Sequence, residues 1–114
     1  MKKISVLIKE PGKKPRHVNI SDSLGNLQKT VDGFIQTVTI ATDLVIICNE
    51  EGLIRDLPYN CTICGAKLFG TIIMCGVDGD KFADLPCDWE TVKRMFPNLF
   101  NNKNRERNER GYLK

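Results

Sequence analysis

Five runs of apolar or alternating residues predict five β-strands. The run at 34–40 is rich in β-branched and aromatic residues, as strands are. The run Thr-Ile-Ile-Met-Cys at 71–75 is apolar enough to be covered on both faces, which predicts a central strand. The predicted strands are residues 4–10, 16–20, 34–40, 44–48 and 69–76.

Two further segments carry apolar residues at helical spacing. Leu27 and Val31 lie four positions apart in the first, and Val92 and Phe96 do so in the second, which ends before Pro97. Residues four apart share one side of a helix. We therefore expect two amphipathic helices whose apolar sides cover the sheet.

The length and the order of these elements predict the fold class. A chain of 114 residues that is 41% hydrophobic and 27% charged has room for one core. We predict a single α+β domain over residues 1–100, of order ββαβββα, with a mixed or antiparallel sheet of about five strands and both helices on one face. Residues 101–114 are basic and too polar to bury a core, so we predict a disordered tail.

The formal net charge of +3 conceals two basic ends and an acidic middle. We interpret this pattern as charged side chains on solvent-exposed faces, followed by a basic tail. The alternative is that the ends bind nucleic acid or another anionic partner, or the acidic middle of a second copy. A homodimer would also help a small domain bury its sheet edges. No apolar run approaches the roughly 18 residues that span a bilayer, so we expect a cytoplasmic protein without membrane contact.

The five cysteines predict reduced thiols rather than a disulfide framework, because their number is odd and some lie in apolar runs. Cys48 and Cys75 are predicted core residues. The spacing Cys61-x-x-Cys64-Gly65 is that of half a zinc ribbon, but the second pair of ligands is missing. We therefore expect small residues in a loop and no cofactor, with zinc at Cys61 and Cys64 as the alternative.

The segment 48–60 is the predicted rim of any site, since an apolar strand stops there at a run of polar residues and a Gly. Adjacent residues such as Glu50 and Glu51 tend to point to opposite sides, which opposes joint catalysis. The side chains of Asn49 and Asn60 are expected to hold the turn together by hydrogen bonds to the backbone. The candidate ligand- or partner-binding residues are Asn49, Glu50, Glu51, Arg55, Asp56 and Asn60.

Four blocks of the sequence resemble a family of small uncharacterised proteins. The most specific is Cys-Asn-Glu-Glu-Gly followed by Leu-Pro-x-Asn within residues 48–60; the others lie at 6–15, 24–35 and 70–76. The family is common in Firmicutes and in their phages, prophages and conjugative elements. The resemblance implies a compact α+β domain of a bacterial host's cytoplasm, with no established activity and an origin on a mobile element.

Three hypotheses of function follow. The first is a non-catalytic accessory protein of a phage or mobile element that binds and neutralises a host component, either a defence protein or a nucleotide signal. The second is a nucleic-acid-binding regulator that uses the basic ends. The third is a small enzyme that uses Glu50, Glu51 or Asp56. With a single histidine and no nucleophile–base set, we expect the first.

Overall fold

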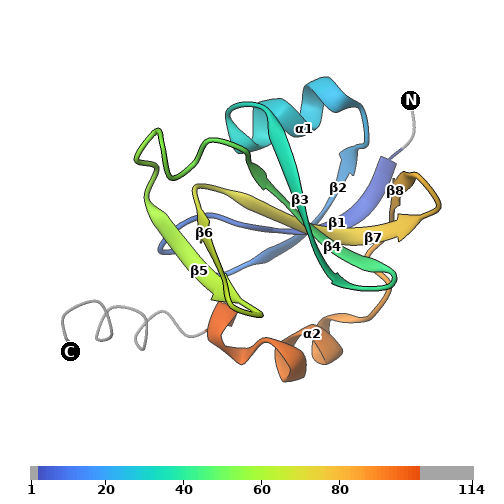
Figure 1. The fold of residues 1–114 in the computed structure, drawn as a ribbon. Coiled ribbons are helices and arrows are strands. Elements are labelled where there is room, and N and C mark those ends of the chain that lie inside the picture. Colours follow the sequence, from blue (N-terminus) through green and yellow to red (C-terminus); the bar gives the residue numbers. More distant parts are fainter. Residues whose placement is uncertain (1–2, 101–114) are drawn as a thin grey trace.

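An antiparallel sheet of six strands forms the middle of the molecule (Figure 1). The computed structural model describes residues 3–100. The strand order is β2-β1-β7-β4-β3, and β8 pairs with β7 beside this path. The predicted central strand is therefore confirmed as β7. The strands are β1 (Lys3–Lys9), β2 (Arg16–Ser21), β3 (Ile35–Ala41), β4 (Leu44–Asn49), β7 (Ile72–Asp78) and β8 (Lys81–Ala83).

The two α-helices of the described chain, α1 (Leu24–Val31) and α2 (Trp89–Met95), cover opposite faces of this sheet. Leu27 and Val31 of α1 belong to one buried cluster, whereas Val92 of α2 belongs to the other. Figure 1 shows α1 above the sheet and α2 below it. The α+β class is confirmed, but the expectation that both helices pack on one face is wrong.

Both faces need a cover because the inner strands are apolar on both sides. Every residue of β4 is buried, and in β7 Ile72 and Met74 face one cluster while Ile73 and Cys75 face the other. A strand with this continuous pattern can be stable only between two layers. The sheet is thus the middle layer of three.

A second sheet, the hairpin of β5 (Tyr59–Ile63) and β6 (Ala66–Phe69), completes the face that α2 covers. The sequence analysis expected Cys61 to lie in a loop, and that prediction is wrong, since Cys61 is part of β5. Cys64 and Gly65 form the two-residue turn between the strands and both have positive φ, at 50° and 84°. Two-residue turns of this backbone type match the twist of a hairpin, so Cys64-Gly65 acts as a hairpin turn.

The ends of the helices follow ordinary capping chemistry. The Ser23 side chain accepts a hydrogen bond from the Asn26 N–H at the start of α1, and Asp88 accepts one from Thr91 at the start of α2. These bonds satisfy amide hydrogens that have no partner within the helix. After α2, the chain makes a short 3₁₀ helix, η1 (Pro97–Phe100). Within residues 3–100 no helix is long and apolar enough to cross a bilayer. The predicted tail, 101–114, lies outside the described residues.

The fold predicts opposite effects for the same substitution at two glycines. A methyl group at Gly76 in β7 would collide with the backbone carbonyl of Asp84, whereas one at Gly25 in α1 would meet nothing within 4 Å. We expect Gly76→Ala to lower the free energy of unfolding by about 1–3 kcal/mol. Gly25→Ala should raise it by about 0.5–1 kcal/mol, because alanine favours the helix. Chemical denaturation of both variants measures this, and equal effects at the two positions would contradict the described packing.

Candidate functional site

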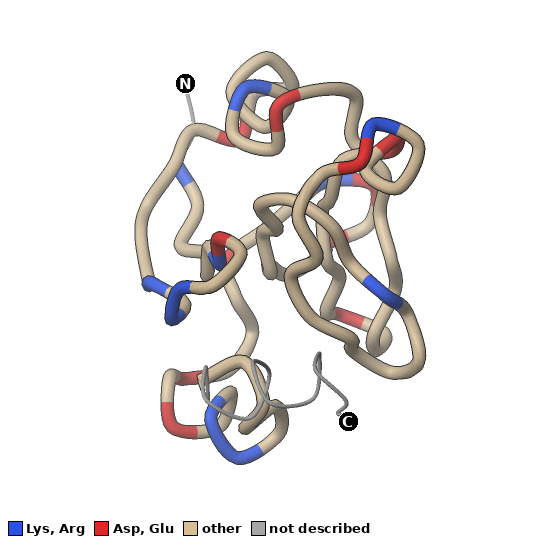
Figure 2. Tube along the Cα trace, turned by 90° about the vertical axis from the view of Figure 1, so that its left-hand side faces the viewer, with Lys and Arg blue, Asp and Glu red and all other residues tan. Residues whose placement is uncertain are grey.

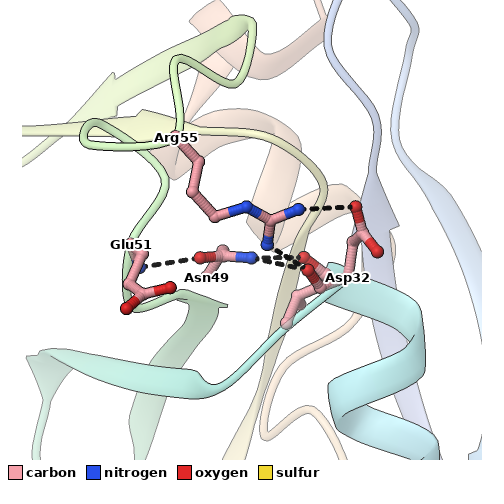
Figure 3. A network of polar contacts seen from close by, with 5 residues as sticks. Asp32, Asn49, Glu51 and Arg55 are labelled. Carbon is pink, nitrogen blue, oxygen red and sulfur yellow. Dashed lines mark hydrogen bonds and ion pairs between the residues drawn. The ribbon is translucent and has the colours of Figure 1, made fainter.

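The side chain of Asn49, at the end of β4, holds together the end of α1 and the turn that follows β4 (Figure 3). Its amide nitrogen donates to the carbonyl oxygens of Val31 and Asp32, each at 3.0 Å. Its amide oxygen accepts the N–H of Glu51 at 2.7 Å. Asn49 is buried, and a buried amide is stable only when such partners are supplied. Asn49 is therefore a structural anchor of the site.

Arg55 reaches back to the same helix end. Its guanidinium donates to the carbonyl oxygen of Asp32 at 2.6 Å and pairs with the Asp32 carboxylate at 3.3 Å. Asp32 can offer its carbonyl because it ends α1 in the left-handed conformation, at φ 65°. At Gly33 an added Cβ would lie 2.6 Å from the Asn49 amide nitrogen and 2.9 Å from the Arg55 guanidinium. The Asp32-Gly33 pair thus leaves the space in which Asn49 and Arg55 converge.

The turn formed by residues 50–56 is closed by its own backbone. The N–H of Arg55 donates to the carbonyl of Glu51 at 2.8 Å, and the N–H of Leu57 donates to that of Gly52 at 2.9 Å. Leu53 and Ile54 stand at its tip with relative exposures of 71% and 86%. The 50–56 turn is therefore an ordered support for two solvent-exposed apolar side chains.

Two hollows flank the 50–56 turn. One, of about 410 Å³, lies between β3, β4, β6 and the turn, and Glu50, Leu53 and Lys67 are among its lining residues. The other, of about 300 Å³, is lined by Glu51 and Arg55 together with residues at the end of α1. Glu50 and Glu51 thus line different hollows, and this arrangement does not bring their carboxylates to one substrate atom.

The remaining predicted site residues lie apart from one another. Asp56 is exposed at the end of the turn, with φ at 59°. Asn60 is fully buried on β5, where its amide nitrogen donates to the carbonyls of Lys9 and Gly70. The expectation that both asparagines tie the turn by side-chain-to-backbone hydrogen bonds is confirmed for Asn49. It is wrong for Asn60, whose bonds to the backbone reach β1 and the residue after β6 instead. Their burial leaves Glu50, Glu51, Arg55 and Asp56 as the predicted residues that a partner can reach, and partner binding there stays a prediction.

A family model described as a domain of unknown function, DUF3846, matches residues 1–97. The chain belongs to this DUF3846 family. The expected membership of an uncharacterised family is thereby confirmed. The matched residues include the whole Asn49 network and the 50–56 turn. Neither a curated protein nor a solved structure matches the chain.

The cysteines of this DUF3846 domain lie in different environments. Cys61 is buried in the core on β5, while Cys64 is exposed at the hairpin turn. In the part of the chain that the structure describes, no three His, Cys, Asp or Glu side chains gather where they could hold a metal ion. Cys48 and Cys75 are buried, as predicted. Burial raises the pKa of the Cys75 thiol to about 12 and also raises that of Cys48, so both thiols are protonated at neutral pH.

Sequence reasoning missed the apolar residues of the site. Leu53 and Ile54 were passed over as part of a polar turn, although two large apolar residues directly after Gly52 are an unusual choice for a solvated turn. Phe34 was predicted to be the first residue of a strand, but it precedes β3 and is exposed. Leu53 and Ile54 are adjacent and both exposed, which makes them a candidate contact surface.

The hydrogen bonds of Asn49 predict that Asn49→Asp lowers the free energy of unfolding by an amount that depends on pH. The carboxylate has the shape of the amide but cannot donate to the Val31 and Asp32 carbonyls, so we expect a loss of about 2–4 kcal/mol in the free energy of unfolding at pH 7. Burial beside carbonyls raises the pKa of the introduced carboxyl above its unfolded value. The folded variant then binds more protons than the unfolded one, and the loss should shrink as the pH falls towards 4.

Chemical denaturation of Asn49→Asp and of wild type at pH 7 and at pH 4 measures the difference between their free energies of unfolding. Glu50→Gln is the matched control, since Glu50 is adjacent and exposed, and it should change stability by no more than about 0.5 kcal/mol. An Asn49→Asp variant as stable as the control would show that the amide does not hold the turn.

Proposed function

We propose that this protein is a non-catalytic accessory protein of a phage or mobile element, which acts in the host cytoplasm by binding and neutralising a host protein through the 50–56 turn. The observation that carries the proposal is the exposure of Leu53 and Ile54 at the tip of an ordered turn. The phage or mobile-element origin rests on the sequence resemblance. A defence protein is the host component that fits this origin best.

The energetics of the turn favour a protein partner. Burying a large aliphatic side chain contributes about 1.5–3 kcal/mol, and presenting it on a turn that is already ordered lowers the entropic cost of association. Leu53 and Ile54 together can therefore act as the central anchors of an interface. A nucleotide signal, the other host component considered, would require a polar and cationic recess, and Arg55 is already engaged with Asp32.

The charges beside the tip suggest the character of that partner. Glu50 and Glu51 are exposed next to Leu53 and Ile54, and the Arg55 guanidinium is paired with Asp32. Lys67 adds one positive charge at the larger hollow, so the charge next to the tip in the sequence is acidic. Rim charges act mainly on association rate and specificity. We expect the partner to present an apolar depression bordered by basic residues.

The nucleic-acid alternative has less support in residues 3–100. At the tip of the β1–β2 hairpin, Glu10 pairs with Lys13 and Arg16 at 3.2 and 3.1 Å, and these hydrogen bonds hold the pKa of the Glu10 carboxyl below its usual value. Figure 2 shows basic and acidic positions interleaved along the described chain instead of gathered on one basic face. The basic segment 101–114 lies outside the described residues, and deleting it tests this alternative by salt-dependent binding.

The enzyme alternative has a direct geometric difficulty. Its candidate groups do not converge, since Glu50 and Glu51 line separate hollows and Asp56 lines neither of them. General acid–base catalysis needs groups within hydrogen-bond reach of one reacting atom. If the wild-type protein turned over a substrate, the non-catalytic proposal would be wrong. Full activity of a Glu50→Gln, Glu51→Gln protein would then show that neither glutamate is the catalytic group.

The proposal predicts that binding depends on the tip of the turn. The tagged protein is used to capture a host protein, and the captured protein is then purified and titrated against three forms of the chain: wild type, Leu53→Gln with Ile54→Gln, and Met95→Gln. Met95 is the matched control, since it is also an exposed apolar residue, at 49%, but belongs to a different element, α2.

We expect the double variant to bind about 100- to 10,000-fold more weakly, which corresponds to the loss of two buried aliphatic anchors at about 1.5–3 kcal/mol each. Met95→Gln should bind as wild type does. Unchanged affinity of the double variant would contradict the proposal, and so would equal losses in both variants.

A further inference from the structure

The edge strand β3 lacks the features that usually keep sheet edges apart. Within residues 3–100, β3 ends the strand order and has β4 as its pairing partner. Its sequence, Ile-Gln-Thr-Val-Thr-Ile-Ala, contains no charge and no proline. Proteins usually protect edges of this length with lysine, proline or a covering segment. The opposite edge, β2, begins with Arg16 directly after Pro15.

The backbone of β3 directs defined hydrogen-bonding groups away from β4. The Phe34 carbonyl accepts the N–H of Glu50 at 2.8 Å, so Phe34 faces the β4 side of the ladder. In an antiparallel pair the direction of the backbone groups alternates from residue to residue. The N–H and C=O groups of Ile35, Thr37 and Thr39 therefore point outward. The register with β4 is regular over this stretch and shifts only between Thr39 and Ala41.

We infer that a second copy of this chain pairs with β3, antiparallel and about a two-fold axis at Thr37. Thr37 is the middle of the regular stretch 35–39. About this axis Thr37 opposes itself, and Ile35 opposes Thr39 of the second copy, so every outward-facing N–H and C=O of the stretch meets one of the opposite kind. A two-fold interface of this type uses the same patch on both copies.

The side chains suit such self-pairing. Two copies of an uncharged strand bring no like charges together, and cross-strand threonine pairs are favourable. In the same register Phe34, which is exposed at 65%, opposes Ile40 of the second copy. Gln36 and Val38, which line the larger hollow, oppose each other across the axis. The pairing thus covers the apolar residue that β3 leaves exposed at its start.

A second copy fits this edge better than a foreign segment because the pattern is complementary to itself. The paired copies would share one continuous sheet and would present two 50–56 turns. Such a bivalent protein can bind a multivalent partner with an avidity beyond that of a single turn. The dimer does not depend on what the turns bind, and it goes beyond the proposed function.

The experiment places a charged side chain at position 37, on the proposed two-fold axis of the dimer. Thr37→Lys and Thr37→Glu are made in the full chain, since the Thr37 side chain is exposed and can be replaced in a folded protein. Sedimentation equilibrium gives the dimer dissociation constant, and native mass spectrometry distinguishes the species in mixtures by mass. Asn19→Lys, an exposed position on the opposite edge strand, is the matched control, and circular dichroism checks that each variant is folded.

We expect wild type and Asn19→Lys to be dimers. Thr37→Lys alone and Thr37→Glu alone should dimerise at least about tenfold more weakly, because each places two like charges opposite each other at the axis. An equal mixture of the two should form the mixed dimer, since opposite charges then meet. Monomeric wild type would overturn the inference, as would a folded Thr37→Lys protein that dimerises like wild type or a mixture that does not form the mixed dimer.

Discussion

The buried amide of Asn49 is the interaction on which the site depends. It lies where β4 leaves the core, and it satisfies polar groups from the end of α1 and from the turn after β4. Without such a partner, the Val31 carbonyl at the end of α1 would face a cost of a few kcal/mol for burial. One side chain thus fixes three neighbouring segments relative to one another.

The rest of the site follows from this anchor and from the three-layer core. Because α1 packs on one face of the sheet, its last turn comes close to the end of β4, and Arg55 can reach the Asp32 carbonyl. The Arg55–Asp32 ion pair is exposed and contributes little by itself. Its role is to orient the turn, which leaves Leu53 and Ile54 at the tip. This exposed, ordered tip is the feature on which the proposed binding role rests.

Much of the fold could be predicted because β1–β4 and β7 have clear periodicity or continuous apolar runs. The hairpin β5–β6 could not, since its strands are short and its turn was interpreted as small residues in a loop. The prediction that both helices cover one face of the sheet was also wrong, and the reason is physical. Helical spacing shows which side of α1 is apolar, but β4 and β7 are apolar on both faces, so the sequence does not indicate which face α1 covers.

The candidate site was predicted in part for similar reasons. Both Asn49 and Asn60 were expected to tie the turn through the backbone, and Asn49 does so. Asn60 binds the backbone of Lys9 and Gly70 instead, because it lies on a strand that the sequence did not indicate. The pairing of Arg55 with Asp32 joins residues far apart in the sequence, and no local pattern indicates it. Leu53 and Ile54 were missed because a polar turn was assumed to be polar throughout.

The central claim, that the 50–56 turn is ordered by the Asn49 network, is tested most directly by amide hydrogen exchange of the wild-type protein, measured by NMR. We expect the amides of Glu51, Arg55 and Leu57 to exchange much more slowly than in an unstructured peptide, since each donates a hydrogen bond that closes the turn. Exchange of all three at the unstructured rate would contradict it.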